Sequence, residues 1–223
     1  MKNIPKHVAI IPDGNRRWAR DHGLPSFEGH LKGFNALIKI GKKAREMGIK
    51  ILTVWVFSTE NWKRSPEEVS YLMNLYQTML NKYLKDALKE KIRIIHLGRK
   101  DRINKTLKKK IIDIEEKTKN FNKYYLGIAL DYGGRDEIVR AIKKSSDLSE
   151  DNFNQFLDTK DLPYPCPDLL IRTSGEMRLS GFMSWHTAYS ELFFSPKYLP
   201  DFTPRDLEEA IKEFSKRQRR FGK

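Results

Sequence analysis

The sequence predicts an α/β fold, a single domain over residues 1–223 with a mostly parallel β-sheet flanked by helices. Short apolar runs such as Ile51–Phe57 alternate with longer segments whose apolar residues recur every three or four positions. Strands that alternate with helices are joined by right-handed crossovers, which place neighbouring strands in parallel. The sequence contains no internal repeat and no change of composition that would mark a domain boundary.

The first strand is expected at Val8–Ile11, where Pro12, Asp13 and Gly14 end it. The basic segment Asn15–Arg20 then reads as the start of a helix. A strand, a glycine turn and a basic helix suit an anion, because free N–H groups and arginine forks can donate to it. Asp13 fits such a site if Mg²⁺ accompanies the anion. The alternative is that Asp13 or Asn15 only caps the helix, and these residues alone leave both readings open.

The next elements are a helix, a strand and a loop. A helix is expected from about Leu31 to Met47, and Gly48 ends it. Its apolar face would hold Phe34, Leu37, Ile38 and Ala44. The continuous apolar run Ile51–Phe57 is typical of a strand buried on both faces, and a polar loop should follow at 58–64.

Ser65 starts the next predicted helix as its cap, because Pro66 fits the first helical position and Glu68 completes a capping box. Its apolar, core-facing side would include Val69, Leu72, Met73, Tyr76, Met79, Leu80, Tyr83 and Leu84. The remaining pattern predicts strands at Ile92–Leu97, Tyr125–Leu130, Leu169–Ile171 and Glu191–Phe194. It predicts helices at Asp101–Lys119, from just after Arg135 to about Lys144, at Asp151–Leu157 and from Thr203 to about Arg219.

The charge balance points to an anionic partner. With 43 Lys and Arg against 29 Asp and Glu, the net charge of +14 would attract nucleic acid, anionic lipid or phosphorylated substrates. Lysine-rich stretches such as Lys105–Lys123 read as solvated helix faces. Five arginines fall instead in predicted turns, which favours a discrete polyanion site over a broad nucleic-acid surface: Arg16, Arg17, Arg64, Arg172 and Arg178.

The sequence lacks a signal peptide and any apolar run near the ~18 residues of a membrane span, so a cytoplasmic protein is expected. Cys166 is the one cysteine, cannot form an internal disulfide, and is interpreted as structural.

Ligand-binding residues are expected at one edge of the sheet, because the loops after parallel strands gather there. These loops contain Asp13, Asn15, Arg17, Ser58, Asn61, Arg64, Arg172, Arg178 and Ser180. With Arg16, these loops carry five arginines, which exceed what one phosphate needs, so two diphosphates fit. The apolar helix after Ser65 adds the expectation of substrates with a charged head and an apolar tail.

Six ordered segments resemble the motifs of the cis-prenyltransferases, and most of all those of the bacterial undecaprenyl diphosphate synthases. They are PDGNRRWA, GHLKG, FSTENWKRSPEEV, LDYGGRDEI, LLIRTSGEMRLSGFMSWHTAYSELFF and RRFG. The resemblance implies a homodimer with a hydrophobic tunnel. It implies repeated, Mg²⁺-dependent addition of isopentenyl diphosphate to farnesyl diphosphate, giving undecaprenyl diphosphate for the carrier lipid of bacterial cell-wall (peptidoglycan) synthesis. Peripheral membrane contact would help such a product to leave.

The resemblance also implies site residues. Asp13 would be the essential carboxylate and hold Mg²⁺, with Glu191 completing the metal site. Asn61 occupies the proton-acceptor position, although a neutral amide is a poor base and orienting a diphosphate oxygen or water is the alternative. The implied substrate-binding residues are Gly14, Asn15, Arg16, Arg17, Trp18, His30, Ser58, Thr59, Glu60, Trp62, Arg64, Arg172, Arg178, Leu179 and Ser180. Glu68 would help to close the loop, and Arg220-Phe221-Gly222 resembles a terminal motif that reaches the site.

The chain departs from the family pattern at five positions: Arg16 for Gly, Ser26 for Arg, Asp131 for Asn, Gly181 for Asn and His186 for Gln. None removes a charge that the chemistry requires. Without an arginine at Ser26, Arg16 and Arg17 are expected to carry more of the diphosphate.

Two other classes of function fit the sequence less well. A non-catalytic partner subunit of a prenyltransferase would keep the fold and lose the site, whereas here the charged site residues are present. A basic nucleic-acid-binding protein fits the charge but leaves Asp13 and Glu191 without a purpose.

Overall fold

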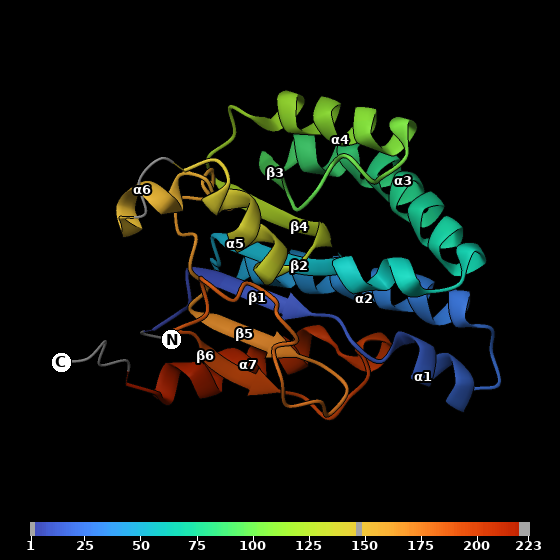
Figure 1. The fold of residues 1–223 in the computed structure, drawn as a ribbon. Helices are drawn as coiled ribbons and strands as arrows, with labels where there is room; N and C mark the ends of the chain where they lie inside the picture. Colours follow the sequence, from blue (N-terminus) through green and yellow to red (C-terminus); the bar gives the residue numbers. More distant parts are fainter. Residues whose placement is uncertain (1–2, 146–148, 219–223) are drawn as a thin grey trace. The chain divides into compact units, whose positions relative to one another are not determined.

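Six strands form one sheet in the computed structural model of the chain, which describes residues 3–145 and 149–218. In spatial order the strands are β3 (Ile92–Leu97), β4 (Tyr124–Tyr132), β2 (Ile51–Ser58), β1 (His7–Ile11), β5 (Leu169–Arg172) and β6 (Glu191–Phe194). The pairs β3–β4, β1–β5 and β5–β6 are parallel. Helices flank the sheet (Figure 1), so the predicted α/β class is confirmed.

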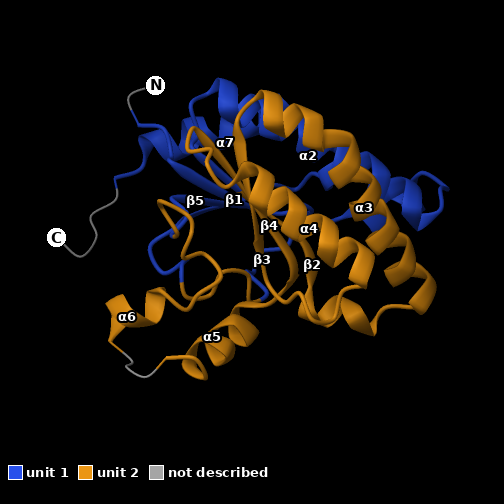
Figure 2. Cartoon of the chain, turned by 90° about the horizontal axis from the view of Figure 1, so that it is seen from above, with its two compact units in different colours: residues 1–52, 166–180, 186–223 blue, residues 53–165, 181–185 orange. Residues whose placement is uncertain are grey.

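The residues divide by their contacts into two compact units (Figure 2). Unit 1 comprises residues 1–52, 166–180 and 186–223, and unit 2 comprises residues 53–165 and 181–185. The first division falls inside β2, in the middle of a continuous apolar run, where no linker composition could mark it. The single domain expected from the sequence stays a prediction.

In unit 1, helices α1 (Asn15–Asp21) and α2 (Ser26–Glu46) approach each other closely. A Cβ at Gly29 would lie 2.0 Å from the carbonyl oxygen of Asn15, and one at Gly33 would lie 2.2 Å from Asn15 Oδ1. The predicted face of α2 is therefore wrong for Phe34, Leu37 and Ile38, which are half-buried because close packing buries the small residues. Ala44 is buried, as predicted. The buried face consists of Gly29, Gly33, Ala36, Ile40 and Ala44.

The last helix of unit 1, α7 (Pro204–Lys216), follows the short helix η2 (Leu199–Asp201). Thr203 and Asp206 form a reciprocal capping box at its start, as the sequence predicts for Thr203. The helix ends at Lys216, before the predicted Arg219, and the Arg220-Phe221-Gly222 motif lies outside the described residues.

Helices α3 (Pro66–Lys89) and α4 (Lys105–Thr118) pack together in unit 2 (Figure 1). The Ser65 hydroxyl accepts the Glu68 N–H at 3.3 Å, which confirms the predicted cap. Their contact encloses one apolar cluster: Phe57, Leu72, Met73, Tyr76, Ile103, Leu107, Ile111 and Leu130. The interpretation of the α3 face as core is confirmed for Leu72, Met73, Tyr76 and Met79, which are buried. The other predicted residues of this face are half-buried: Val69, Leu80, Tyr83 and Leu84.

Two further boundaries in unit 2 differ from the prediction for local reasons. Residues Thr59–Lys63 form a short 3₁₀ helix, η1, where a loop was expected, because Ser58 and Asn61 cap each other. Helix α4 begins at Lys105 and not at Asp101, because Asn104 Oδ1 accepts the Leu107 N–H at 2.8 Å. Helices α5 (Gly134–Ile142) and α6 (Glu150–Asn154) complete the unit. In the described parts of the chain, no helix is long and apolar enough to span a membrane.

Candidate functional site

The turn after β1 depends on Gly14, which has a φ of 98°. A Cβ there would lie 2.6 Å from the Tyr198 ring and 2.8 Å from Ser174 Cβ, so no larger residue fits. Gly14 is itself the N-cap of α1, with no side-chain cap bond, and Asn15 is the first helical residue. The reading of Asp13 or Asn15 as a helix cap is therefore wrong.

Asp13 is held by its backbone and offers its carboxylate. The Asp13 N–H donates to Thr173 Oγ1 at 2.8 Å, and the Thr173 hydroxyl donates to the Asp13 carbonyl at 2.7 Å. Its Oδ2 accepts from Arg172 Nη2 at 2.9 Å and its Oδ1 from the Gly14 N–H at 2.6 Å. Burial raises the pKa of Asp13, but the Arg172 hydrogen bond and charge, Gly14 and Arg17 together bring it below the ordinary value. Asp13 is thus a fixed, ionised carboxylate.

Arg172, the last residue of β5, is the most buried cation of this region, with 6% of its side chain exposed. Its Nη1 donates to Ser180 Oγ at 2.9 Å and to the Arg178 carbonyl. Its Nε is buried and has no hydrogen-bond partner among the described residues. Because this N–H donor is unused, the Arg172 guanidinium can bind an anionic ligand.

Glu176 connects two further arginines, and the sequence reading did not select it. Its Oε1 accepts from Arg17 Nη1 at 3.0 Å and its Oε2 from Arg178 Nη1 at 2.5 Å. Arg17 also donates to Ser174 Oγ at 2.6 Å. Hydrogen bonding and charge from Arg178, and then Arg17, lower the pKa of Glu176. A carboxylate within a motif rich in arginine was the available signal.

These contacts form a cluster, called here the Asp13 cluster, of Asp13, Arg17, Arg172, Glu176 and Arg178. Its three guanidinium groups exceed its two carboxylates by one positive charge. Arg178 is 60% exposed and the carboxylate of Asp13 is 31% exposed, so solvent reaches the cluster. The arrangement suits a multiply charged anion at the carboxyl ends of β1 and β5, as predicted for Asp13, Arg17, Arg172, Arg178 and Ser180.

Other predicted residues of unit 1 lie outside this hydrogen-bonded cluster. Trp18 is buried and donates its Nε1–H to Asp201 Oδ1 at 2.9 Å, so it contributes to the core. The buried Oδ1 of Asn15 has no hydrogen-bond partner among the described residues. Arg16 is exposed on α1, while His30 on α2 and Leu179 after β5 are half-buried.

Glu191 is not brought near Asp13. It is the first residue of β6 and lies level with Leu169, whereas Arg172, which contacts Asp13, lies level with Phe194. Three strand residues at about 3.3 Å each separate the two levels. The Glu191 carboxylate accepts from Arg217 Nη1 at 2.8 Å. Within one chain, the structure therefore does not assemble the two carboxylates expected to share a metal.

The predicted residues of unit 2 are carried by β2 and η1. The Ser58 N–H donates to Asn61 Oδ1 at 3.0 Å, so the acceptor of the Asn61 amide is occupied while its Nδ2 is left as donor. Thr59 packs against Gly133, where a Cβ would lie 2.6 Å from its Oγ1, and Glu60 is exposed. Arg64 Nη1 donates to Glu68 Oε1 at 2.9 Å, which gives Glu68 an ion pair beside its place in the helix start.

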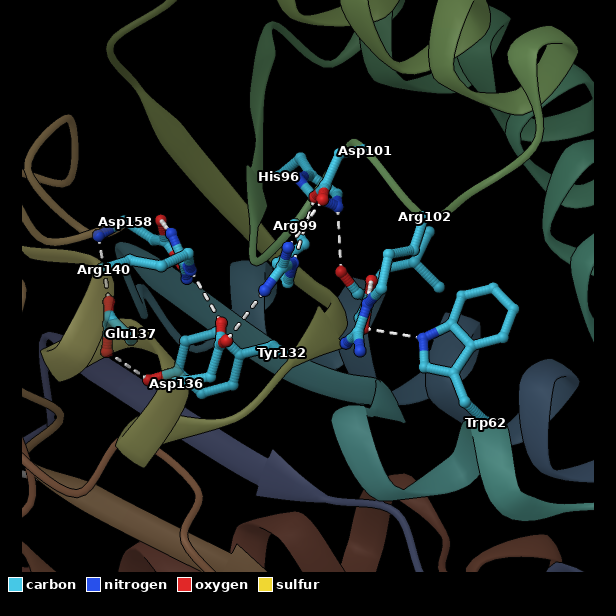
Figure 3. A network of polar contacts seen from close by, with 12 residues as sticks. Trp62, His96, Arg99, Asp101, Arg102, Tyr132, Asp136, Glu137, Arg140 and Asp158 are labelled. Atoms are coloured by element: carbon cyan, nitrogen blue, oxygen red, sulfur yellow. Dashed lines mark hydrogen bonds and ion pairs between the residues drawn. The ribbon is translucent and has the colours of Figure 1, made fainter.

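Trp62 belongs to a polar network in the same unit (Figure 3). Its indole Nε1–H donates to Asp131 Oδ1 at 2.8 Å, and its ring meets Phe57 edge-on with centroids 5.1 Å apart. The role of Asp131 as its partner could not be read from the sequence, because the two residues are far apart along the chain.

Comparison with known proteins places this geometry in a family. Residues 11–222 match the profile of the undecaprenyl diphosphate synthase family, Prenyltransf. The chain is 49% identical to an isoprenyl transferase from Thermotoga maritima, covering 98% of this chain and 97% of the relative. It is 47% identical to an isoprenyl transferase from Aquifex pyrophilus, covering 99% and 96%.

Two solved structures of prenyl diphosphate synthases have a fold similar to that of this chain. Lavandulyl diphosphate synthase from Lavandula x intermedia, in complex with dimethylallyl diphosphate, superposes with a TM-score of 0.94 at 36% identity and covers 99% of both chains. A probable undecaprenyl diphosphate synthase from Campylobacter jejuni gives a TM-score of 0.83 at 35% identity, covering 99% of this chain and all of that one. With its parallel sheet and its arginine-rich Asp13 cluster, the chain belongs to the undecaprenyl diphosphate synthase family and is a transferase of prenyl groups.

Proposed function

We propose that the chain adds isopentenyl diphosphate repeatedly to farnesyl diphosphate and forms a long cis-polyprenyl diphosphate, undecaprenyl diphosphate. The observation that carries this proposal is the Asp13 cluster, in which a fixed carboxylate lies among arginines that exceed the local negative charge. Two diphosphates would satisfy those arginines. The product would supply the carrier lipid of bacterial cell-wall synthesis.

In this proposal the arginines divide the two substrates between them. Arg17, with Gly14, Asn15 and Arg16 beside it, binds the diphosphate of the allylic substrate, whose leaving oxygens gain negative charge. Arg172 and Arg178 hold isopentenyl diphosphate so that its alkene is aligned for attack, and Leu179 and Ser180 assist them. Fixed donors that face a developing charge lower the barrier, and alignment removes the entropy cost of the encounter.

The donor set at Asp13 fits Mg²⁺ when a diphosphate is present. Mg²⁺ in proteins takes one or two carboxylates and completes its shell with phosphate oxygens and water. Asp13 supplies one ionised carboxylate, and the described residues contain no group of three acidic, histidine or cysteine side chains that would form a complete protein cage. When bound, Mg²⁺ would neutralise charge on the leaving diphosphate. Asp13 is proposed as its ligand, without Glu191 of the same chain.

Asn61 is proposed to orient a substrate and not to remove a proton. Its Oδ1 is already an acceptor for the Ser58 N–H, so the amide can offer Nδ2 as a donor to a diphosphate oxygen or a water. Ser58, Thr59, Glu60, Trp62 and Arg64 are proposed to complete substrate binding in the same segment. Trp18 and His30 are proposed to act beside the allylic substrate through the packing of α1 and α2.

The apolar cluster of unit 2 supports a long hydrocarbon product. Its residues come from β2, α3, the loop before α4, α4 and β4 and expose almost no surface, so a chain that entered between them would meet mainly apolar side chains. We propose that the tunnel for the growing chain forms there. We further propose a homodimer in the cytoplasm that touches the membrane when the product leaves, with the basic surface aiding that contact.

The decisive experiment incubates the protein with farnesyl diphosphate, radiolabelled isopentenyl diphosphate and Mg²⁺ and reads product length by chromatography. We expect elongation to about eleven isoprene units in total, the length that the family name states, and its loss when EDTA removes the metal. Elongation that stops after one addition would overturn the long-chain product. No Mg²⁺-dependent elongation by the protein alone would favour the non-catalytic partner subunit. Light scattering during gel filtration tests the homodimer.

A further inference from the structure

Asp131 is a buried carboxylate at the end of β4 that the reaction scheme above does not use. None of its side chain is exposed, and its φ of 53° is in the left-handed region, which non-glycine residues rarely adopt. A buried charge is tolerated only when it is paired and fully hydrogen-bonded. The partners of Asp131 therefore show what the fold is built to hold there.

Its two carboxylate oxygens join two other segments of unit 2. Oδ1 accepts the indole N–H of Trp62 at 2.8 Å, and Oδ2 accepts Nε of Arg102 at 2.9 Å. Arg102 Nη2 also donates to Oδ1, so the guanidinium binds the carboxylate through two donors. Figure 3 shows the indole of Trp62 and the guanidinium group of Arg102 close to each other. One buried carboxylate thus connects η1 with the loop before α4.

The two partners of Asp131, Arg102 and Trp62, also contact each other. The guanidinium carbon of Arg102 lies 5.8 Å from the centre of the Trp62 ring, within the range of a cation–π interaction. The Phe57 ring meets the Trp62 ring edge-on, with the two ring centroids 5.1 Å apart. The Trp62 side chain is therefore fixed by a hydrogen bond, a cation and an apolar neighbour at once.

Trp62 lies one residue after Asn61 in the five-residue helix η1. A helix this short has few bonds of its own, so the orientation of the Asn61 amide depends on how its neighbours are held. The Asp131 contact acts on η1 from outside and restricts its rotation. An apolar residue at 131 would leave both the indole N–H and the guanidinium without a partner.

We propose that Asp131, together with Arg102, is a positioning residue for prenyl transfer, which fixes Trp62 and through it the Asn61 amide. This inference rests on the proposed function, since it assigns the purpose of the contact to the prenyl-transfer reaction. Asp131 touches no substrate and acts through Trp62. This positioning requires a negative charge at residue 131, because only a carboxylate accepts hydrogen bonds from the indole and from both arginine donors together.

The test is a double-mutant cycle of Asp131→Asn and Trp62→Phe, with kcat and KM measured for both diphosphates on protein shown to be folded by circular dichroism. Asparagine has the same shape but presents an amide donor toward Arg102, and phenylalanine keeps a ring without the N–H. We expect each single variant to lower kcat about tenfold, the scale of one charge-assisted hydrogen bond, with KM changed less than about twofold. The double variant should be no slower than the poorer single variant.

A spectroscopic readout separates positioning from a general loss of structure. The chain has four tryptophans, so ¹⁵N-tryptophan labelling gives four indole N–H signals, and Trp62→Phe identifies the signal of Trp62. Asp131→Asn should move that signal and leave the other three in place. Asp113→Asn, on the exposed face of α4, is the matched control and should change neither the spectrum nor kcat.

Wild-type kcat in Asp131→Asn, or losses that multiply in the double variant, would overturn the proposal. If Asp131→Asn does not fold, Trp62→Phe decides alone, since wild-type kcat without the indole donor also overturns it. Failure of the proposed function looks different, because the unaltered protein would then elongate nothing while its indole spectrum stayed sensitive to Asp131.

Discussion

Asp13 in unit 1 and Asp131 in unit 2 are both aspartates near the end of a strand, and both accept a hydrogen bond from an arginine. They differ in their exposure to solvent and in how closely the surrounding donors and charges match the carboxylate. The side chain of Asp13 is 31% exposed and that of Asp131 is fully buried. Around Asp13 the arginines outnumber the carboxylates, whereas the oxygens of Asp131 match the donors of Arg102 and Trp62.

The difference shows that an aspartate–arginine pair does not by itself mark a ligand site. A matched, buried pair holds the protein together, whereas an exposed cluster with a surplus cation still has an interaction to offer. The two units also contain ionisable groups whose pKa values are shifted in opposite directions. Arginines hold the pKa of Asp13 low, while burial raises the pKa of Glu137 in unit 2 to about 7.

The largest effect is expected where the exposed cluster loses its carboxylate. Asp13→Asn keeps the size of the side chain but removes the charge that holds Arg172 and would bind Mg²⁺. We expect kcat for chain elongation to fall about 10³-fold, as when a group that stabilises developing charge is removed. Steady-state kinetics with labelled isopentenyl diphosphate measure this. Asp21→Asn, which changes an exposed aspartate at the end of the following helix α1, should stay active. More than a tenth of wild-type kcat in Asp13→Asn would show that Asp13 has no role in the reaction.

The second prediction concerns the pH dependence of folding stability, to which Glu137 and Asp13 should contribute with opposite signs. The pKa of Glu137 is raised from 4.5 to about 7, first by burial and then by the neighbouring Asp158. The folded state therefore binds the proton more tightly, and stability should decrease as pH rises from about 4.5 to 7. The loss approaches roughly 3 kcal/mol by linkage. For Asp13 the pKa is lowered, so its contribution is present at neutral pH and is lost in acid.

Urea unfolding from pH 5 to 8 measures the Glu137 contribution. Glu137→Gln can still accept the Asp158 N–H and should flatten the decline between pH 5 and 7. Glu116→Gln, which changes an exposed carboxylate on α4, should keep the wild-type slope. An unchanged slope in Glu137→Gln would show that Glu137 ionises normally in the folded protein.

The strands and the Asp13 cluster were predictable for a common reason. Apolar runs such as Ile92–Leu97 are local signals, and residues after parallel strands meet at one edge, so Asp13 and Arg172 could be brought together on paper. The buried face of α2 was not predictable, because Gly29 and Gly33 are buried by the approach of α1 and not by hydrophobicity. Glu176 and Asp131 were missed because their roles depend on contacts and not on residue type.

The third prediction compares a binding arginine with a structural one. Arg172→Lys keeps a positive charge but loses the fork that reaches Asp13, Ser180 and the Arg178 carbonyl at once. We expect kcat/KM for isopentenyl diphosphate to fall about thirtyfold. Arg140→Lys in unit 2 also breaks a two-donor pair, with Asp158, but should lower the melting temperature and leave KM unchanged. Equal kinetic losses in both variants would erase the distinction between the two regions.

The smallest effect is expected at Glu176, where the surplus of charge can be increased directly. Glu176 occupies Arg17 and Arg178 while no diphosphate is present, and an incoming anion must compete with it. Because both contacts are partly exposed to solvent, each is worth little, and Glu176→Gln should tighten the binding of inorganic pyrophosphate only about threefold. Isothermal titration calorimetry measures the change, with Glu116→Gln as an exposed control in unit 2. Weaker binding in Glu176→Gln would mean that the carboxylate holds the two arginines ready for the anion, so that the cluster depends on matched charge in the same way as Asp131 does.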